Sequence, residues 1–216
     1  MEKKANETIV TFMLDESGSM DPVRDRTISG FNEYIGILKS DDTPTLLRLM
    51  PFNSMGIRTV YDFEEVESVP DMTADGYRPD SLTPLYDAIG QGIGDTDAYV
   101  DKADGSVDVI FTIVTDGLEN DSSRYSRRRI FEMISDRQEK GWVFTFLGAN
   151  QDSWEQGGRL GIRRGFTSNY DAGSPDEALR RTAYYNLGSK ASLRRGIKPE
   201  KLSEKEGRKR AGHSRP

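Results

Sequence analysis

The chain has 216 residues, of which 35% are hydrophobic and 31% charged, and this length fits one domain or one domain with a tail. It contains no cysteine, so disulfides, thiolate metal sites and cysteine nucleophiles are excluded together. The single histidine, His213, lies near the end of the chain in a polar stretch, which argues against a Ser-His-Asp triad and a histidine-ligated zinc site. The apolar run from Ile9 to Leu14 is too short for a signal peptide or a membrane span, so we expect a cytoplasmic protein without membrane contact.

Charge is distributed unevenly along the chain. Residues 194–216 hold nine basic and three acidic residues, a balance of +6, although the whole chain carries −6. The remaining 193 residues therefore carry −12. We expect one domain over residues 1–193 that ends in a helix, followed by a basic, disordered tail over 194–216.

Strands and helices are expected to alternate along the chain. An apolar run predicts a strand buried on both faces, and an apolar stripe at helical spacing predicts a helix that packs on the sheet. In the first half of the chain the expected elements are a strand at 7–15, a helix from Asp21 to about Leu38, a hairpin of strands 45–52 and 57–63, an irregular acidic surface excursion at 64–79 and a helix at 81–93. In the second half they are a strand at 107–116, a helix at about 125–140, a strand at 142–149 and a short helix near 153–160. A weak edge strand near 163–167 and a helix from Ser174 to about Leu193 follow. Such alternation predicts a three-layer α/β fold with a mainly parallel sheet.

Short oxygen-bearing side chains follow two of the expected buried strands and precede one helix. The three segments are Asp15-Glu16-Ser17-Gly18-Ser19, Leu82-Thr83-Pro84 and Thr115-Asp116-Gly117. In a parallel sheet, sites gather outside the carboxyl ends of the strands, where Asp15 and Asp116 are expected. Two carboxylates and the hydroxyls of Ser17, Ser19 and Thr83 would supply the hard oxygen ligands that Mg²⁺ prefers, and Mn²⁺ accepts the same donors.

Each of these segments also has an ordinary structural explanation. Asp and Ser after a strand are common loop and N-cap residues, and Asp-Gly is a common turn. The occurrence of all three segments in one chain, in this order and at strand or helix ends, favours a metal site over three unrelated loops.

The three segments together resemble the metal-ion-dependent adhesion site (MIDAS) of the von Willebrand factor type A (vWA) family. That pattern is D-x-S-x-S after a first apolar strand, a threonine that opens a later helix, and an apolar strand that ends in T-D-G. By matching position, the resemblance implies a metal bound by Asp15, Ser17, Ser19, Thr83 and Asp116. It covers about residues 7–168, and segments such as TISGFNEYI and TPLYDAIG are similar to the small stand-alone bacterial or phage members. It implies a Rossmann-like, doubly wound sheet with one antiparallel edge strand, the second strand of the 45–63 hairpin.

The resemblance also implies a function. In this family the protein leaves one metal position open, and a carboxylate of a partner protein commonly fills it. The chain would then be a non-enzymatic, metal-dependent protein–protein interaction module. Side chains around the mouth would tune specificity, and nine polar residues are candidates for this rim, although each is also explained by plain loop polarity: Glu16, Asp21, Asn53, Glu119, Asn120, Asp121, Asn150, Gln151 and Asp152.

Two other functions stay open on the sequence alone. A Mg²⁺-dependent phosphohydrolase or phosphotransfer enzyme could use the same site, but that chemistry normally needs D-x-D spacing and a positioned lysine, and position 17 is serine. An adaptor could contact nucleic acid through the basic tail by non-specific charge, without interleaved aromatic residues for base stacking.

Two further motifs are explained without a ligand. The GQGIG segment at 90–94 lies inside a helical stripe rather than between a strand and a helix, so it predicts close helix packing and not phosphate binding. The arginines at positions 124, 127, 128 and 129 are expected to form a solvated helix face.

Overall fold

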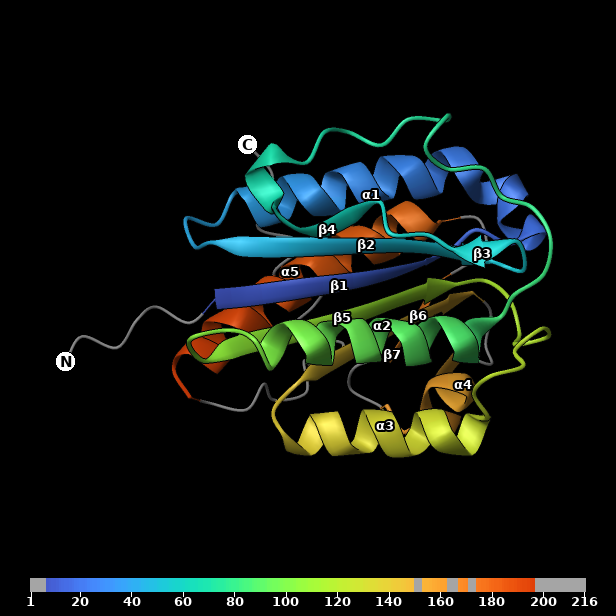
Figure 1. Ribbon diagram of the computed structural model, residues 1–216. Coiled ribbons are helices and arrows are strands. Elements are labelled where there is room, and N and C mark those ends of the chain that lie inside the picture. Colours follow the sequence, from blue (N-terminus) through green and yellow to red (C-terminus); the bar gives the residue numbers. More distant parts are fainter. Residues whose placement is uncertain (1–6, 150–152, 163–166, 171–173, 197–216) are drawn as a thin grey trace.

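The computed structural model describes residues 7–149, 153–162, 167–170 and 174–196 (Figure 1). The strands are β1 (Glu7–Asp15), β2 (Thr45–Asn53), β3 (Gly56–Ile57), β4 (Tyr61–Glu65), β5 (Val107–Thr115), β6 (Val143–Ala149) and β7 (Thr167–Tyr170). The helices are α1 (Arg24–Lys39), α2 (Leu85–Val100), α3 (Arg127–Glu139), α4 (Ser153–Arg159) and α5 (Pro175–Arg194), and two short 3-10 helices are η1 (Gly18–Val23) and η2 (Val66–Ser68).

The strands form one mixed sheet in the order β3-β2-β1-β5-β6-β7, and β4 also pairs with β2. The four pairings from β2 through β7 are parallel, whereas β3 and β4 run antiparallel to β2. Strand β1 lies at the centre and is buried along its length from Thr8 to Asp15, because layers of helices cover both faces. The expected three-layer, Rossmann-like α/β fold with an antiparallel edge is confirmed.

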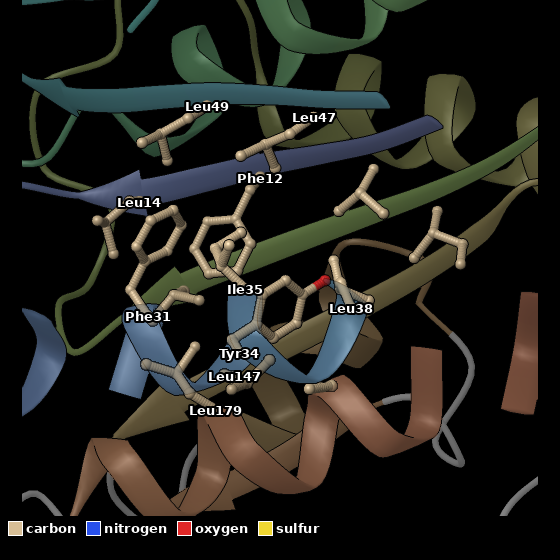
Figure 2. Close-up of a cluster of buried hydrophobic side chains, with 14 of the residues drawn as sticks. Phe12, Leu14, Phe31, Tyr34, Ile35, Leu38, Leu47, Leu49, Leu147 and Leu179 are labelled. Atoms are coloured by element: carbon tan, nitrogen blue, oxygen red, sulfur yellow. The ribbon is translucent and has the colours of Figure 1, made fainter. Parts of the chain in front are cut away.

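Helices α1 and α5 pack on one face of the sheet, and α2 and α3 cover the other (Figure 1). Alternate side chains of β1 pack against the two helix layers, because successive residues of a strand point to opposite faces of the sheet. Figure 2 shows the first layer, in which the ring of Phe12 meets those of Phe31 and Tyr34 edge to face, at centroid distances of 5.2 and 5.0 Å. Met13 points the other way and packs with α2.

The hairpin and the acidic stretch after it differ from the expectation. The single strand predicted at 57–63 is split into β3 and β4, with a register shift in the pairing of β4 with β2. The stretch 64–79 is not only a surface excursion, because Val66, Val69 and Tyr77 are fully buried against the core beside α1. Its apolar residues are too sparse to show a period, so the sequence pattern could not place them inside.

Helix α2 begins and ends later than the expected range of 81–93. Thr83 precedes the helix, and Pro84 has a non-helical ψ of 60°, so the helix begins at Leu85. It continues to Val100 because polar contacts extend the buried face beyond the apolar stripe: the hydroxyl of Thr96 lies 2.8 Å from that of Thr11 in β1.

The C-terminal elements follow the expectation with small shifts. Strand β7 begins at Thr167, where the expected edge strand ended, and residues 163–166 lie outside the described residues. Helix α5 runs one residue beyond the predicted end, to Arg194, and most of the expected tail, 197–216, lies outside the described residues. Within the described ranges, no helix combines the length and the apolar character that crossing a membrane requires.

Candidate functional site

The site lies where β1 and β5 end side by side. The two strands are parallel neighbours, and their register aligns Leu14 with Val114, so the next residues, Asp15 and Thr115, also lie together. The hydroxyl of Thr115 donates a hydrogen bond of 2.5 Å to Oδ2 of Asp15. At the carboxyl end of β1, the carboxylate of Asp15 is therefore oriented by Thr115 of the neighbouring strand β5.

The loop after β1 is folded back on this carboxylate. The backbone N–H of Ser17 donates to Oδ1 of Asp15 at 2.8 Å, and the N–H of Gly18 donates to the carbonyl of Ser81 at 3.0 Å. The buried hydroxyl of Tyr77 donates to the carbonyl of Asp15 at 2.6 Å. Both oxygens of the Asp15 carboxylate and its own carbonyl are thus fixed by residues from three separate segments.

The remaining predicted ligands converge on the same place. The hydroxyl of Ser19 donates to Oδ1 of Asp116 at 2.6 Å and lies 3.2 Å from the hydroxyl of Ser17. A methyl group placed on Gly117 would lie 3.1 Å from Oγ1 of Thr83, 3.5 Å from Oγ of Ser19 and 3.7 Å from Oδ2 of Asp15. The structure therefore brings the side chains of all five residues into one cluster.

Thr83 owes its position to the loop after β5. Its backbone N–H donates to Oδ1 of Asn120 at 2.8 Å, and the N–H of Asn120 donates back to the carbonyl of Thr83 at 3.2 Å. Thr83 is buried, and this two-way bond holds its hydroxyl beside Gly117. The loop that carries Asp116 thus also positions the ligand candidate that opens α2.

The surroundings of Asp15 and Asp116 disfavour the ionised form of both carboxylates. Burial raises the pKa of Asp15 to about 6 against the opposing effect of hydrogen bonds from Thr115 and Ser17, and the charge of Asp116 raises it further. Burial also raises the pKa of Asp116, although the bond from Ser19 opposes this. No ion pair in the described part of the chain includes either residue.

The donor set matches a hard divalent cation. Two carboxylates and three hydroxyls are the oxygen ligands that Mg²⁺ and Mn²⁺ accept, whereas soft or nitrogen ligands are missing from the cluster. Among the described residues no group of three or more His, Cys, Asp or Glu side chains gathers as a metal site. Any metal site here would therefore depend on hydroxyl ligands as much as on carboxylates.

Two of the expected rim residues have a structural role instead. Glu16 is buried, and its carboxylate accepts hydrogen bonds from the guanidinium of Arg58 and from the backbone N–H of Arg78. Asn53 is also buried and donates to the carbonyl of Glu16 at 3.3 Å. Both side chains therefore stabilise the loop after β1 from the interior of the protein and are not exposed at the edge of the site.

Of the other expected rim residues, one supports the fold through hydrogen bonds and three are exposed at the surface. The carboxylate of Glu119 accepts from the N–H groups of Tyr86 and Ser122, so it caps the start of α2 and folds its own loop. Asp21, Asn120 and Asp121 are exposed near the site. The remaining three, Asn150, Gln151 and Asp152, lie outside the described residues.

A buried carboxylate on α2 was missed in the sequence. Asp87 accepts hydrogen bonds from the backbone N–H groups of Ser123, Arg124 and Tyr125 at 2.8 to 3.2 Å. Burial opposes its ionisation, but these three N–H groups and the charge of Arg124 hold its pKa below the usual value. Asp87 therefore anchors the loop after β5, and its position inside an ordinary helical stretch gives no sign of this.

The two motifs that the sequence explained without a ligand behave as expected. A methyl group on Gly90 would lie 2.7 Å from the ring of Tyr125, and one on Gly92 would lie 2.7 Å from the sulfur of Met13. Gly90 and Gly92 therefore permit close packing of α2, whereas a methyl group on Gly94 would meet nothing within 4 Å. The side chains at Arg124, Arg127, Arg128 and Arg129 are exposed.

No protein-family model and no curated protein sequence matches the chain significantly. Solved structures do match. The manganese-loaded TRAP protein of Plasmodium vivax has a TM-score of 0.56 at 18% identity, over 83% of this chain and 74% of that one. A von Willebrand factor type A structure from Catenulispora acidiphila has a TM-score of 0.56 at 15% identity, over 85% and 43%.

Two further matches are to longer chains. The pilus adhesin SpaC of Lactobacillus rhamnosus GG, in its open conformation, has a TM-score of 0.63 at 11% identity, over 85% of this chain and 30% of that one. Proximal thread matrix protein 1 of the mussel byssus has a TM-score of 0.58 at 13% identity, over 83% and 45%. The chain thus spans less than half the length of three of these four structures. At such identities the likeness shows the fold, which is a Rossmann-like vWA fold.

Proposed function

We propose that this chain is a non-enzymatic protein-interaction module that holds Mg²⁺ or Mn²⁺ at the end of β1 and, through it, a carboxylate of a partner protein. The observation that carries the proposal is the convergence of five oxygen-bearing side chains from three distant segments on one place beside Gly117. The five proposed ligands are Asp15, Ser17, Ser19, Thr83 and Asp116.

The electrostatics of the cluster support a cation. The buried carboxylate of Asp15 and the half-buried one of Asp116, both with a raised pKa, lie together without a basic partner among the ion pairs of the described chain, and a divalent cation would favour the ionised form of both. When bound, the ion would supply a Lewis-acidic position for one more oxygen ligand. Because the protein already offers two carboxylates, a third from a partner fits the preference of Mg²⁺ for oxygen donors.

The names of two similar structures are consistent with this proposal. TRAP was solved loaded with manganese, and SpaC is a pilus adhesin. Binding rather than turnover is also supported by the sequence, because position 17 is serine where a phosphotransfer site would be expected to carry a second carboxylate. We place the module in the cytoplasm, with which the lack of cysteine is compatible, and in a bacterium or phage-infected cell by its resemblance to small stand-alone members.

Thermal unfolding with and without metal tests the first step. A ligand that binds only the folded state raises the melting temperature, so Mg²⁺ or Mn²⁺ at a hundredfold excess over its Kd should stabilise the protein by about 2.7 kcal/mol. Asp15→Ala and Asp116→Ala should abolish this shift. Asp80→Ala is the matched control, because Asp80 is an exposed carboxylate on the neighbouring loop. A wild-type protein whose unfolding is indifferent to EDTA and to added metal would refute the proposal.

A pull-down from the native cell, with Mg²⁺ or with EDTA, tests the second step. The expected partner is retained with Mg²⁺ and released by EDTA, and substitution of one Asp or Glu of that partner by Asn or Gln abolishes retention. A partner that stays bound in EDTA, or that tolerates removal of every carboxylate at its contact surface, would contradict bridging through the metal.

A further inference from the structure

Large apolar side chains are exposed around the candidate site. Five large hydrophobic residues of the described chain are exposed, namely Met55, Val60, Leu82, Leu118 and Phe131. Leu82 is 48% exposed and directly precedes the ligand candidate Thr83, and Leu118 is 66% exposed and directly follows Gly117. Met55, at 78%, is the most exposed of the five.

Hydrogen bonds tie these three residues to the site. The backbone N–H of Ser54 donates to the carbonyl of Leu82 at 3.0 Å, and the N–H of Leu82 donates to the hydroxyl of Ser54 at 3.2 Å. Met55 follows Ser54, and its own N–H donates to Oδ1 of the buried Asn53 at 2.9 Å. The two-way bond between Thr83 and Asn120 fixes the loop that carries Leu118.

We infer that Met55, Leu82 and Leu118 form an apolar rim that selects the residues next to the partner's carboxylate; this inference rests on the proposed function. Their loops are held by hydrogen bonds, so these loops lose little conformational entropy when a partner covers them. Exposed apolar patches rimmed by polar residues mark protein-interaction sites, and these three side chains lie on hydrogen-bonded loops beside the proposed ligands. The rim therefore adds a metal-independent contribution to binding.

The charges near the rim restrict what the partner can be. Asp21, Asp80 and Asp121 are exposed acidic residues on the loops around the site. They repel a run of acidic residues, so only a carboxylate that the metal neutralises can approach at low cost. The partner segment that fits is one Asp or Glu flanked by apolar residues, and a polyacidic segment is excluded.

Short synthetic peptides test the inference. One peptide carries a single Asp between leucines, a second carries Asn in its place, a third has serines as flanks and a fourth has aspartates as flanks. Binding is measured by fluorescence anisotropy with saturating Mg²⁺. The leucine-flanked Asp peptide should bind best, and the serine flanks should weaken it about tenfold or more, because an apolar side chain that leaves water gains on the order of 1.5 kcal/mol or more.

Rim variants separate this inference from the metal site. Leu118→Ser and Leu82→Ser should weaken the leucine-flanked peptide about tenfold and leave the Mg²⁺ shift of the melting temperature unchanged. Val60→Ser is the matched control, because Val60 is exposed but lies in the connection between β3 and β4. Equal binding of leucine-, serine- and aspartate-flanked peptides, with an intact Mg²⁺ shift, overturns the rim and leaves the proposed function standing. A wild-type protein without any Mg²⁺ shift overturns both.

Discussion

Thr115, the last residue of β5, donates its hydroxyl hydrogen to the carboxylate of Asp15, the last residue of β1, at 2.5 Å. The same hydroxyl accepts from the N–H of Gly117 at 3.1 Å. One side chain therefore orients a proposed metal ligand and also shapes the turn that follows Asp116. Thr115 needs no contact with the ion to control how the cluster is arranged.

Thr115→Val should weaken metal binding while Thr115→Ser preserves it. Valine keeps the shape of the side chain but removes the hydroxyl, and loss of a hydrogen bond that orients a metal ligand typically costs 10- to 100-fold in affinity, roughly. Titration calorimetry with Mn²⁺ measures the change. Equal affinities of the valine variant and the wild type would show that the bond to Asp15 has no orienting role.

The metal-free protein should lose stability as the pH rises through the titration of Asp15. Its folded-state pKa of about 6 lies above the unfolded value of 3.8, so its contribution is fully present below about pH 4 and is lost as the pH rises through about 6. The loss is on the order of 3 kcal/mol. The urea-unfolding free energy in EDTA, compared between the wild type and Asp15→Asn from pH 4 to 7.5, isolates this residue.

With increasing pH the Asp15→Asn variant should gain stability relative to the wild type in EDTA, since Asn carries no charge to bury. Saturating Mg²⁺ should reverse that order at pH 7.5, because only the carboxylate binds the ion. A difference between the two proteins that is constant across this range would contradict the raised pKa.

Asp87→Asn should loosen the loop after β5. The variant replaces a carboxylate that accepts from three backbone N–H groups, and the unsatisfied groups should cost about 2 kcal/mol or more in unfolding free energy. Its lowered pKa means that the contribution is present above about pH 4 and is lost only as the pH falls below that value, which is opposite in direction to Asp15. Urea unfolding at pH 7 and pH 3 tests both statements.

Trypsin gives an independent readout of the same variant, since the loop contains exposed Arg124 and leads to the arginines of α3. Cleavage near Arg124 should be faster in Asp87→Asn than in the wild type under native conditions. Asp104→Asn, at an exposed turn, is the control. Unchanged cleavage in the Asp87 variant would mean that the loop is held by other contacts.

Gly117→Ala should remove metal binding without unfolding the protein. The added methyl group would lie 3.1 Å from the hydroxyl of Thr83 and within 3.7 Å of two further proposed ligands, so it would displace or cover them. Gly36→Ala on α1 is the matched control, because a methyl group there meets nothing within 4 Å and should stabilise the helix by about 1 kcal/mol. The Mg²⁺ shift in melting temperature, with circular dichroism as a check on folding, distinguishes the two.

Much of the fold and of the site was predictable because both depend on local patterns. An uninterrupted apolar run such as ETIVTFMLD is soluble only as a strand covered on both faces, which requires helices on each side of a parallel sheet. Parallel strands place their carboxyl ends at one edge, so Asp15 and Asp116 were expected to be neighbours. In the structure Asp116 accepts from Ser19, and Asp15 joins the same hydrogen-bonded cluster through Ser17.

Other features could not be predicted because they depend on contacts between distant segments. Tyr77 donates to the carbonyl of Asp15 across 62 residues, and Asp87 holds a loop more than 30 residues further along the chain. Neither lies in a recognisable motif. The same reason explains the errors over Glu16 and Asn53, which look like exposed loop residues in sequence but are buried. Asn53 donates to the carbonyl of Glu16, and the carboxylate of Glu16 accepts from the backbone N–H of Arg78.

The sequence by itself determined which side chains could serve as ligands and at which end of the sheet they would lie, because strand periodicity and strand polarity are local properties. Only the tertiary structure decided which polar residues support the cluster and which surround its mouth. Burial and hydrogen bonding depend on what the rest of the chain places beside a residue. The apolar rim of Met55, Leu82 and Leu118 is a case in point, because an isolated leucine in a loop gives no sign that its neighbours leave it exposed beside five converging oxygens.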